Sequence, residues 1–309
     1  MTLIRTSPPP SEWGVVIDRT ASGGLAERWR ERDFPPPAFD YPGLPSWKDE
    51  DWFDFCVLGC SVVACLWPPT GEPVWATEFE GVWLDDAPGL FACFARQPLQ
   101  VEDFLDFGPL QAREFFAGRG SLQMINERAT TMQGVARALF DRWGGQALKM
   151  NERAQWDGPR LVQLLVETIP GYRDEAETSL GKLSFNKLAH LCVAMMNSRS
   201  SRPIGRLETF PVYPDYMLPK VLRYYGVLRY ESELSSTVDG GRLVPAGSDW
   251  EVAIRWATVY AGDQLRADLN RIGNPVSTPA LDYALWHDAV LGSEAALMGP
   301  HHRTVTMAY

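Results

Sequence analysis

Apolar residues recur at helical spacing through most of the chain after about residue 101, which predicts a largely helical fold. Glycine and proline mark the ends of several segments: Gly144 and Gly145 follow the first long one, and Pro170 follows the next. No repeat and no long linker separates them, so we expect a single helical domain. The predicted helices cover residues 126–143, 159–169, 183–197, 216–225, 248–272 and 279–291, with two short amphipathic segments at 101–118.

The first third of the chain has a different pattern. Residues 1–48 are rich in proline and predict an extended arm with one short helix near 25–32. Residues 51–84 combine an apolar β-branched run, CVLGCSVVACLW, with an alternating one, GEPVWATEFEGVW, after a turn at 68–71. The whole pattern predicts a mainly α protein. It has a proline-rich arm over 1–48 and one domain over 49–309, with a small β element at about 51–84 and helices over 101–309.

Composition adds a large core and an acidic balance to this picture. Hydrophobic residues make up 45% of the 309 residues, which include 12 tryptophans and 14 phenylalanines. The net charge of −10 argues against a nucleic acid as the main partner, because affinity for a phosphate backbone comes from many lysine and arginine contacts. A small anionic ligand, which needs only two or three local donors, remains compatible with this charge.

The cysteines and the apolar runs predict the cellular location of the protein. The five cysteines lie mostly in apolar runs, and no Cys or His pair follows at zinc-site spacing, so we expect buried free thiols and no metal or other cofactor. The opening MTLIRTSPPPSEW lacks the apolar core of a signal peptide, and the longest apolar run, 57–67, is well below the roughly 20 residues that span a bilayer. We therefore expect a cytoplasmic protein without a membrane partner. The cysteines are Cys56, Cys60, Cys65, Cys93 and Cys192.

Asp282 is the first candidate for chemistry. Thr278 and Pro279 form a typical helix start, a hydroxyl cap followed by proline, which puts Asp282 in the first turn. Its helical neighbours at i+3 and i+4 are Leu285 and Trp286, so its carboxylate lies beside an apolar strip. The alternative is an acid that only stabilises the helix N-terminus, a contribution of under ~1 kcal/mol.

Asp215 precedes another predicted helix and has the same two interpretations. It is either an N-cap or part of a binding site. The binding interpretation rests on a density of tyrosines that suits stacking on a planar base, and on the attraction of helix N-termini for anions. These tyrosines are Tyr213, Tyr216, Tyr224 and Tyr225.

Arginine and histidine add further candidates. Glu251 and Arg255 stand at i and i+4, which fits either a surface ion pair or an arginine that points inward to a carboxylate or phosphate. His287, next to a tryptophan and an aspartate, is a site candidate. The basic tail from His301 to Arg303 is either disordered or docked near a phosphate, and the apolar ending VTMAY favours docking. These residues alone predict a small-molecule site in a helical protein and leave the reaction open.

The segments after residue 127 resemble the queuosine salvage protein family in order and spacing. The combination of DYMLP, EVAIR and LDYALW is specific, although no one of these motifs would be. The family implies an all-α fold similar to the helix-hairpin-helix DNA glycosylases, without their DNA-binding role. It implies hydrolysis of queuosine 5′-monophosphate to queuine and ribose 5-phosphate. The matching segments are LLVETIPGYRDEA, GKLSFNKLAHLCVA, FPVYPDYMLPKVLRYYGVLRYESEL, EVAIRWATVYAGDQL, LDYALW and HHRTVTMAY.

The resemblance also implies roles for particular residues. The family's carboxylate in LDYxLW, a nucleophile or transition-state stabiliser, matches Asp282. The acid of its aromatic-x-Asp-Tyr motif matches Asp215, with Tyr213 as the aromatic residue. Its serine-phenylalanine-x-lysine stretch matches Ser184, Phe185 and Lys187. The chain departs from the family elsewhere, with methionine at 195 where relatives carry aspartate and histidine at 287 where relatives can carry an acid.

From the resemblance we expect a division of labour among these residues. Asp282 would act on the ribose, and Asp215 would hold the base or its cyclopentenediol amine. Lys187 or Arg255 would contact the 5′-phosphate. The protein would be a monomer acting on a small molecule. The groups expected to line the site are Tyr213, Tyr283, Phe185 and His287.

Two other functions remain open at this point. A non-catalytic protein that binds queuine or a modified nucleoside would use the same acids and aromatic rings. Excision of bases from DNA is the third possibility, and the acidic net charge disfavours it.

Overall fold

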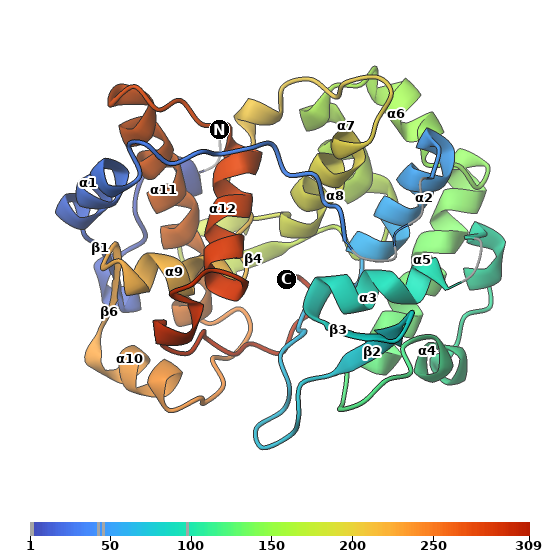
Figure 1. The fold of residues 1–309 in the computed structure, drawn as a ribbon, viewed down its shortest axis with the longest axis horizontal. Helices are drawn as coiled ribbons and strands as arrows, with labels where there is room; N and C mark the ends of the chain where they lie inside the picture. Colours follow the sequence, from blue (N-terminus) through green and yellow to red (C-terminus); the bar gives the residue numbers. More distant parts are fainter. Residues whose placement is uncertain (1–2, 42–43, 45–46, 97–98) are drawn as a thin grey trace. The chain divides into compact units, whose positions relative to one another are not determined.

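The computed structural model describes residues 3–41, 44, 47–96 and 99–309 and is rich in helix (Figure 1). By their contacts these residues form two compact units, each built from separate stretches of chain. The single domain expected over 49–309 therefore stays a prediction. Unit 1 consists of the described parts of Met1–Pro37, Asp174–Lys187 and Leu207–Val305. Unit 2 consists of the described parts of Ala38–Arg173, Leu188–Arg206 and Thr306–Tyr309.

Unit 1 is organised around the long helix α11, which spans Asp249–Arg271 and packs against α1, α9 and α12. Its N-cap is Ser248, whose hydroxyl accepts a hydrogen bond from the Glu251 N–H. Apolar side chains cover almost every side of the helix, as expected for a helix inside a core. The other helices of the unit are α1 (Arg19–Arg28), α9 (Met217–Tyr224), α10 (Ser232–Asp239), α12 (Thr278–Val290) and the short 3₁₀ turns Leu3–Arg5, Ser11–Trp13, Leu207–Thr209 and Ala295–Leu297.

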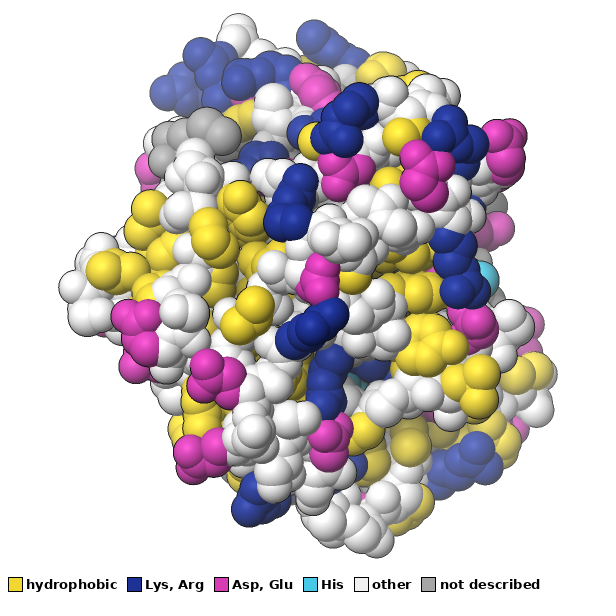
Figure 2. Space-filling model, turned by 90° about the vertical axis from the view of Figure 1, so that its left-hand side faces the viewer, with side chains coloured by type: hydrophobic (Ala, Val, Ile, Leu, Met, Phe, Trp, Pro, Cys, Tyr) yellow, Lys and Arg dark blue, Asp and Glu magenta, His cyan; other side chains and the backbone are white. Residues whose placement is uncertain are grey.

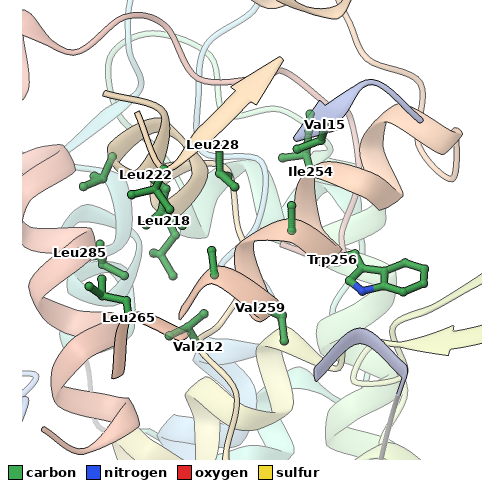
Figure 3. Close-up of a cluster of buried hydrophobic side chains, with 14 of the residues drawn as sticks. Val15, Val212, Leu218, Leu222, Leu228, Ile254, Trp256, Val259, Leu265 and Leu285 are labelled. Atoms are coloured by element: carbon green, nitrogen blue, oxygen red, sulfur yellow. The ribbon is translucent and has the colours of Figure 1, made fainter. Parts of the chain in front are cut away.

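The core of unit 1 lies where these helices meet two short strands, β1 (Val15–Ile17) and β6 (Leu228–Tyr230). The strands are antiparallel, with Val15 opposite Tyr230. Figure 3 shows side chains from β1, β6, α9, α11 and α12 converging on one cluster. Burial of each large apolar side chain contributes roughly 1.5–3 kcal/mol, so this cluster provides much of the stability that holds the helix ends in place. The labelled members are Val15, Val212, Leu218, Leu222, Leu228, Ile254, Trp256, Val259, Leu265 and Leu285.

Unit 1 also contains a hairpin that the sequence did not predict. Strands β4 (Glu175–Thr178) and β5 (Gly181–Ser184) pair antiparallel, with Glu175 opposite Ser184. The helix predicted over 183–197 begins only after this hairpin, as α8 (Lys187–Ser198). The prediction extended the helix too far because Leu183 and Phe185 are buried residues that also fit its apolar period.

Unit 2 is mostly helical. The buried Tyr172 hydroxyl donates to the Val57 carbonyl at 2.6 Å, and the Trp52 ring N–H donates to the Met195 carbonyl at 3.0 Å. All five cysteines of the chain are buried free thiols, as predicted. The elements of unit 2 are α2 (Asp49–Cys60), β2 (Ala76–Phe79), β3 (Val82–Asp85), α3 (Asp86–Ala95), the 3₁₀ turn Val101–Phe104, α4 (Pro109–Phe115), α5 (Ile125–Trp143), α6 (Leu148–Ala154), α7 (Gly158–Thr168) and most of α8.

The β element predicted at about 51–84 is only half right. Ala76–Phe79 and Val82–Asp85 form a hairpin, as predicted, with Glu80 and Gly81 in the left-handed conformation that tight hairpin turns need. The run over 51–60, in contrast, is the helix α2. Three acids in its first turn stabilise a helix start, and periodicity cannot separate a fully buried helix from a buried strand.

Several predicted boundaries need smaller corrections. The helix expected near 25–32 is α1, which begins at Arg19 after Asp18, whose carboxylate accepts from the Ala21 N–H. The cap of α12 is Ser277, and Thr278 is the first helical residue. The helices predicted at 126–143, 159–169, 216–225, 248–272 and 279–291 are found within one or two residues of those bounds. Within the residues described, no helix combines the length and apolar character needed to cross a membrane.

Candidate active site

Asp282 lies near the start of α12 with only 8% of its surface exposed. Its Oδ1 accepts a hydrogen bond of 2.6 Å from the backbone N–H of Tyr213. Burial raises the pKa of Asp282 well above its usual range, and the nearby charge of Asp215 raises it further. The Tyr213 N–H and the Lys187 ammonium act in the opposite direction. The result is a buried carboxyl group that is oriented by the backbone and binds its proton tightly.

Asp215 comes from the segment that leads into α9 and is 9% exposed. Its Oδ1 accepts from the N–H groups of Met217 (2.7 Å) and Leu218 (3.0 Å). Asp215 therefore satisfies backbone donors at the start of α9, although the N-cap of this helix is Tyr216, one residue later than the capping interpretation predicted. Burial also raises its pKa, while Lys187 and the two backbone donors lower it. Capping and membership of a buried acidic site are compatible for this residue.

Lys187 connects the two acids. It is the first residue of α8 and is 5% exposed. Its positive charge lowers the pKa of both Asp215 and Asp282. Two carboxyl groups and one ammonium group share a water-poor place, so full ionisation would leave a net negative charge there.

Arg255 lies on α11 with 3% of its surface exposed. Its guanidinium forms a two-pronged ion pair with Asp174: Nη1 lies 2.9 Å from Oδ1, and Nη2 bonds Oδ2. Nη1 also lies 3.4 Å from Oε1 of Glu251, and Nε donates to the carbonyl of Pro214 at 3.2 Å. The Glu251–Arg255 pair is thus buried rather than on the surface, and the arginine points inward to a carboxylate.

Asp174 is a site residue that the sequence analysis missed. Its carboxylate accepts from Arg255 and from the backbone N–H of Lys187 (3.3 Å). The GYRDEA segment contributed to the family resemblance, but no local spacing connects Asp174 with an arginine 81 positions away. Only the fold brings them together.

Two of the predicted aromatic residues lie among these groups. Phe185 is buried, and its ring centre lies 4.1 Å from the Arg255 guanidinium carbon. Tyr213 is buried, and its phenol pKa is raised by burial and by the charge of Asp282. The structure thus places Phe185 and Tyr213 with Asp282, Asp215 and Lys187.

Tyr283 and His287 lie on another side of α12. His287 is five residues after Asp282, so about 100° per residue puts it roughly 140° around the helix from that acid. Its side chain is 45% exposed, and its ring centre lies 6.3 Å from that of Tyr283. Nδ1 of His287 is 3.9 Å from Asp288, which pairs with Arg32. The helix geometry therefore separates His287 from the face of α12 that carries Asp282.

The basic tail is docked in unit 1. The Val244 N–H donates to the Arg303 carbonyl at 2.8 Å, and the ring of His301 packs against Tyr216 with 4.8 Å between centres. Burial, together with neighbouring cations, lowers the pKa of His301 to about 4 and that of His302 to about 3. Both rings are therefore neutral near pH 7. In the described part of the chain, no group of three His, Cys, Asp or Glu residues could hold a metal ion.

Comparison with known proteins identifies the family. The profile of the family described as "Queuosine salvage protein" matches residues 100–309. A protein of Sphaerobacter thermophilus named queuosine 5′-phosphate N-glycosylase/hydrolase is 27% identical over 307 residues, an alignment that covers 96% of this chain and 93% of that protein. Proteins of the same name from mouse and cattle are 28% and 26% identical over 64% and 61% of this chain, and the alignments cover 63% and 59% of their own lengths.

These alignments extend the resemblance beyond the segments after residue 127. The family profile begins at residue 100, and the bacterial alignment covers almost the whole chain. The buried acids, Lys187 and the Asp174–Arg255 pair all lie within the profile's range. The chain belongs to the queuosine salvage protein family.

Proposed function

We propose that this protein hydrolyses the N-glycosidic bond of queuosine 5′-monophosphate and releases queuine and ribose 5-phosphate. The observation that carries the proposal is the buried pair Asp215 and Asp282 around Lys187, in a chain whose relatives are named queuosine 5′-phosphate N-glycosylase/hydrolase. An acid pair in a water-poor site supports bond cleavage, because carboxylates there interact strongly with a developing cation.

Asp282 is the proposed catalytic residue. As the bond between C1′ and the base nitrogen breaks, its electron pair goes to the base and positive charge develops on the ribose. The Asp282 carboxylate stabilises that charge. Water then adds its oxygen to C1′, and one of its protons goes to the departing base. The Tyr213 N–H bond fixes the direction of the carboxylate, so little reorganisation is needed during the reaction.

The proposed role needs the ionised form of Asp282, and burial opposes that form by raising the pKa of the carboxyl group. Lys187 opposes the effect of burial and keeps the ionised form accessible. We propose that the pair holds one proton in the free enzyme, and that Asp282 is the ionised member when substrate is bound.

Asp215 is proposed to hold the base or its cyclopentenediol amine. A 7-deazaguanine base has no N7 to protonate, so the enzyme must bind the departing base through its other polar edges. One oxygen of Asp215 is bound to the start of α9, which fixes the carboxylate in one orientation. A fixed, buried carboxylate is a suitable partner for an ammonium group or for base N–H donors.

The remaining site residues take supporting roles in the proposal. Phe185 and Tyr213 line the site. Of the two cations considered for the 5′-phosphate we retain Lys187, because Arg255 is bound to Asp174, Glu251 and the Pro214 carbonyl. Tyr283 and His287 remain proposed substrate contacts, with weaker support because they lie on another side of α12 from Asp282.

Further parts of the proposal concern partners, fold likeness and location. We propose that the protein acts as a monomer in the cytoplasm, on a free nucleotide rather than on nucleic acid, and that its helical fold is similar to the helix-hairpin-helix DNA glycosylases. The net charge of −10 supports the choice of a free nucleotide. Figure 2 shows basic side chains interspersed with acidic and apolar ones over most of the face it presents.

The test incubates the protein with queuosine 5′-monophosphate and follows both products by mass spectrometry. We expect queuine and ribose 5-phosphate in equal amounts. The second candidate, a protein that binds queuine without cleaving anything, rests on the same acids and rings. Calorimetric binding of queuine with no product in the mass spectrum would favour it.

A further inference from the structure

The polar backbone and side-chain groups of Asp174 bond to two parts of the structure, the turn 185–187 and the side chain of Arg255. Its N–H donates to Oδ1 of Asn186 at 3.1 Å, and its carbonyl accepts from the N–H groups of Phe185 (2.9 Å) and Asn186 (3.3 Å). Its carboxylate accepts from the Lys187 N–H and forms the ion pair with Arg255. One residue thereby holds the whole turn 185–187 and the side chain of an arginine on α11.

The turn held by Asp174 contains one residue in the left-handed conformation. Asn186 has φ of +50°, which glycine adopts freely and asparagine tolerates better than most other residues. Surrounding contacts stabilise this conformation. Two backbone bonds to the Asp174 carbonyl, and the bond from the Asp174 N–H to the Asn186 side chain, supply these contacts. Lys187 follows directly at the start of α8.

Arg255 connects this turn to the segment that holds the acids. Its Nε donates to the carbonyl of Pro214, which lies between Tyr213 and Asp215. The N–H of Tyr213 in turn holds Asp282. Asp174 therefore bonds to Lys187 directly. Through Arg255 it is also linked to Pro214, which lies next to Asp215 and to the Tyr213 that bonds Asp282.

We propose that Asp174 is a positioning residue that, through Arg255 and the turn 185–187, holds Lys187 in place opposite Asp215 and Asp282. Asp174 bonds the backbone of Lys187, whose charge lowers the pKa of both acids. The catalytic consequence rests on the proposed function, whereas the effect on the two acids does not.

Other charged groups lie near these residues and also influence the two acids or Arg255. Arg255 on α11 lowers the pKa of Asp215, and the Tyr213 phenol interacts with Asp282. His302, in the segment after α12, feels the charge of Arg255 but is neutral near pH 7. Glu251 shares the guanidinium with Asp174, and its other oxygen accepts from the Gly247 N–H at 3.2 Å.

The direction in which the pKa of the two acids shifts distinguishes a loss of charge from a displacement of Lys187. Replacing Asp174 with asparagine removes a negative charge and leaves Arg255 less neutralised. That change alone would let both acids ionise at lower pH. Displacement of Lys187 has the opposite effect, because each acid loses a cation. A shift to higher pH thus reports positioning rather than loss of charge.

The experiment titrates the two acids in the full-length protein. Aspartate labelled with ¹³C at the side-chain carboxyl gives one resonance per residue, and Asp215→Asn and Asp282→Asn assign the two that matter. In Asp174→Asn we expect both resonances to titrate about one pH unit higher than in wild type. The matched control is Glu251→Gln, which removes a charge from the same arginine without touching the turn 185–187. We expect its resonances to stay in place or to move to lower pH.

A second variant covers a failure of Asp174→Asn to fold. Asn186→Gly suits the positive φ, leaves the Asp174–Arg255 pair intact and removes the acceptor of the Asp174 N–H. It should move both acids in the same direction by a smaller amount.

The outcomes separate the inference from the proposed function. Unchanged titration in both Asp174→Asn and Asn186→Gly, or a shift to lower pH, would overturn the positioning role even if activity is lost. A shift to higher pH in a protein whose wild type releases no queuine would support the positioning role and reject the proposed reaction.

Discussion

The backbone N–H of Tyr213 lies 2.6 Å from Oδ1 of Asp282, although the two residues are 69 positions apart. This bond joins the segment that enters α9 to the first turns of α12. A carboxylate bound by a backbone amide is oriented before substrate arrives, which suits the role proposed for Asp282.

Asp282→Asn should therefore keep the fold and lose the reaction. The asparagine carbonyl can still accept the Tyr213 N–H, but it cannot stabilise a cation or take a proton. We expect kcat to fall by about 10³-fold or more, with the unfolding temperature little changed. Asp288→Asn, at the other end of the same helix, is the control. It should cost only the ion pair with Arg32 and retain activity. Comparable activity in Asp282→Asn and wild type would remove Asp282 from the mechanism.

Gly262→Ala tests whether the Tyr213–Asp282 bond depends on close packing. A Cβ at Gly262 would lie 2.6 Å from Cγ2 of Val212, the residue before Tyr213. We expect a loss of about 1–3 kcal/mol in the free energy of unfolding from overpacking, and a fall in kcat as the Tyr213 N–H moves. Gly24→Ala is the matched control, because nothing lies within 4 Å of its added Cβ. It should leave kcat unchanged and raise stability slightly. If kcat is retained in the destabilised Gly262→Ala protein, the packing against Val212 does not orient Asp282.

Lys187→Met tests whether the charge of this lysine lowers the pKa of Asp215 and Asp282. Without that charge the pKa of both carboxyl groups rises, so the limb of the pH–rate profile that reports ionised Asp282 should move to higher pH. If Lys187 also binds the phosphate, KM for the nucleotide will rise more than KM for the nucleoside queuosine. Lys182→Met, an exposed lysine on β5 paired with Glu175 and Glu177, is the control and should leave the limb in place. An unmoved limb in Lys187→Met would mean that the lysine does not influence the catalytic acid.

Asp54 should make stability depend on pH. Burial raises the pKa of this carboxyl to about 7, while the Ala147 N–H at 2.6 Å partly opposes the rise. Between its unfolded value near 4 and about 7, the folded protein keeps a proton that the unfolded chain has lost. The contribution of Asp54 to the free energy of unfolding should therefore decrease as pH rises through about 7.

Denaturant unfolding at several pH values measures this effect. Asp54→Asn keeps an acceptor for the Ala147 N–H and cannot titrate, so the decrease should be smaller than in wild type. Asp106→Asn, whose side chain is almost fully exposed, should reproduce the wild-type curve. A wild-type slope that survives in Asp54→Asn would assign the effect to other groups.

The long helices could be predicted from sequence because their apolar periods and caps agree. Ser248, Gly144 and Pro170 stand where α11 begins, where α5 ends and just beyond α7. The run over 51–60 could not be assigned in the same way, since a helix buried on all sides has no polar face to reveal its period. Hairpin β4–β5 was missed because the buried residues Leu183 and Phe185 also fit the apolar period of the helix that follows.

The site was predictable only in part. Asp282 and Asp215 were candidates from their local patterns, and the family resemblance added Phe185 and Lys187. The fold gathers these residues with Tyr213. Asp174 was missed because its partners are far away in sequence and depend on the fold. The helical period alone indicates that His287 points away from Asp282, and this signal was available before the structure.

The proposed reaction is the turnover of queuosine 5′-monophosphate at Asp282. The most direct measurement counts moles of queuine released per mole of protein over time, for wild type and Asp282→Asn side by side, with excess substrate. We predict many equivalents from wild type at a constant initial rate and almost none from the variant. Intact substrate after prolonged incubation of a wild-type protein that still binds queuine, or equal release by both proteins, would contradict the account.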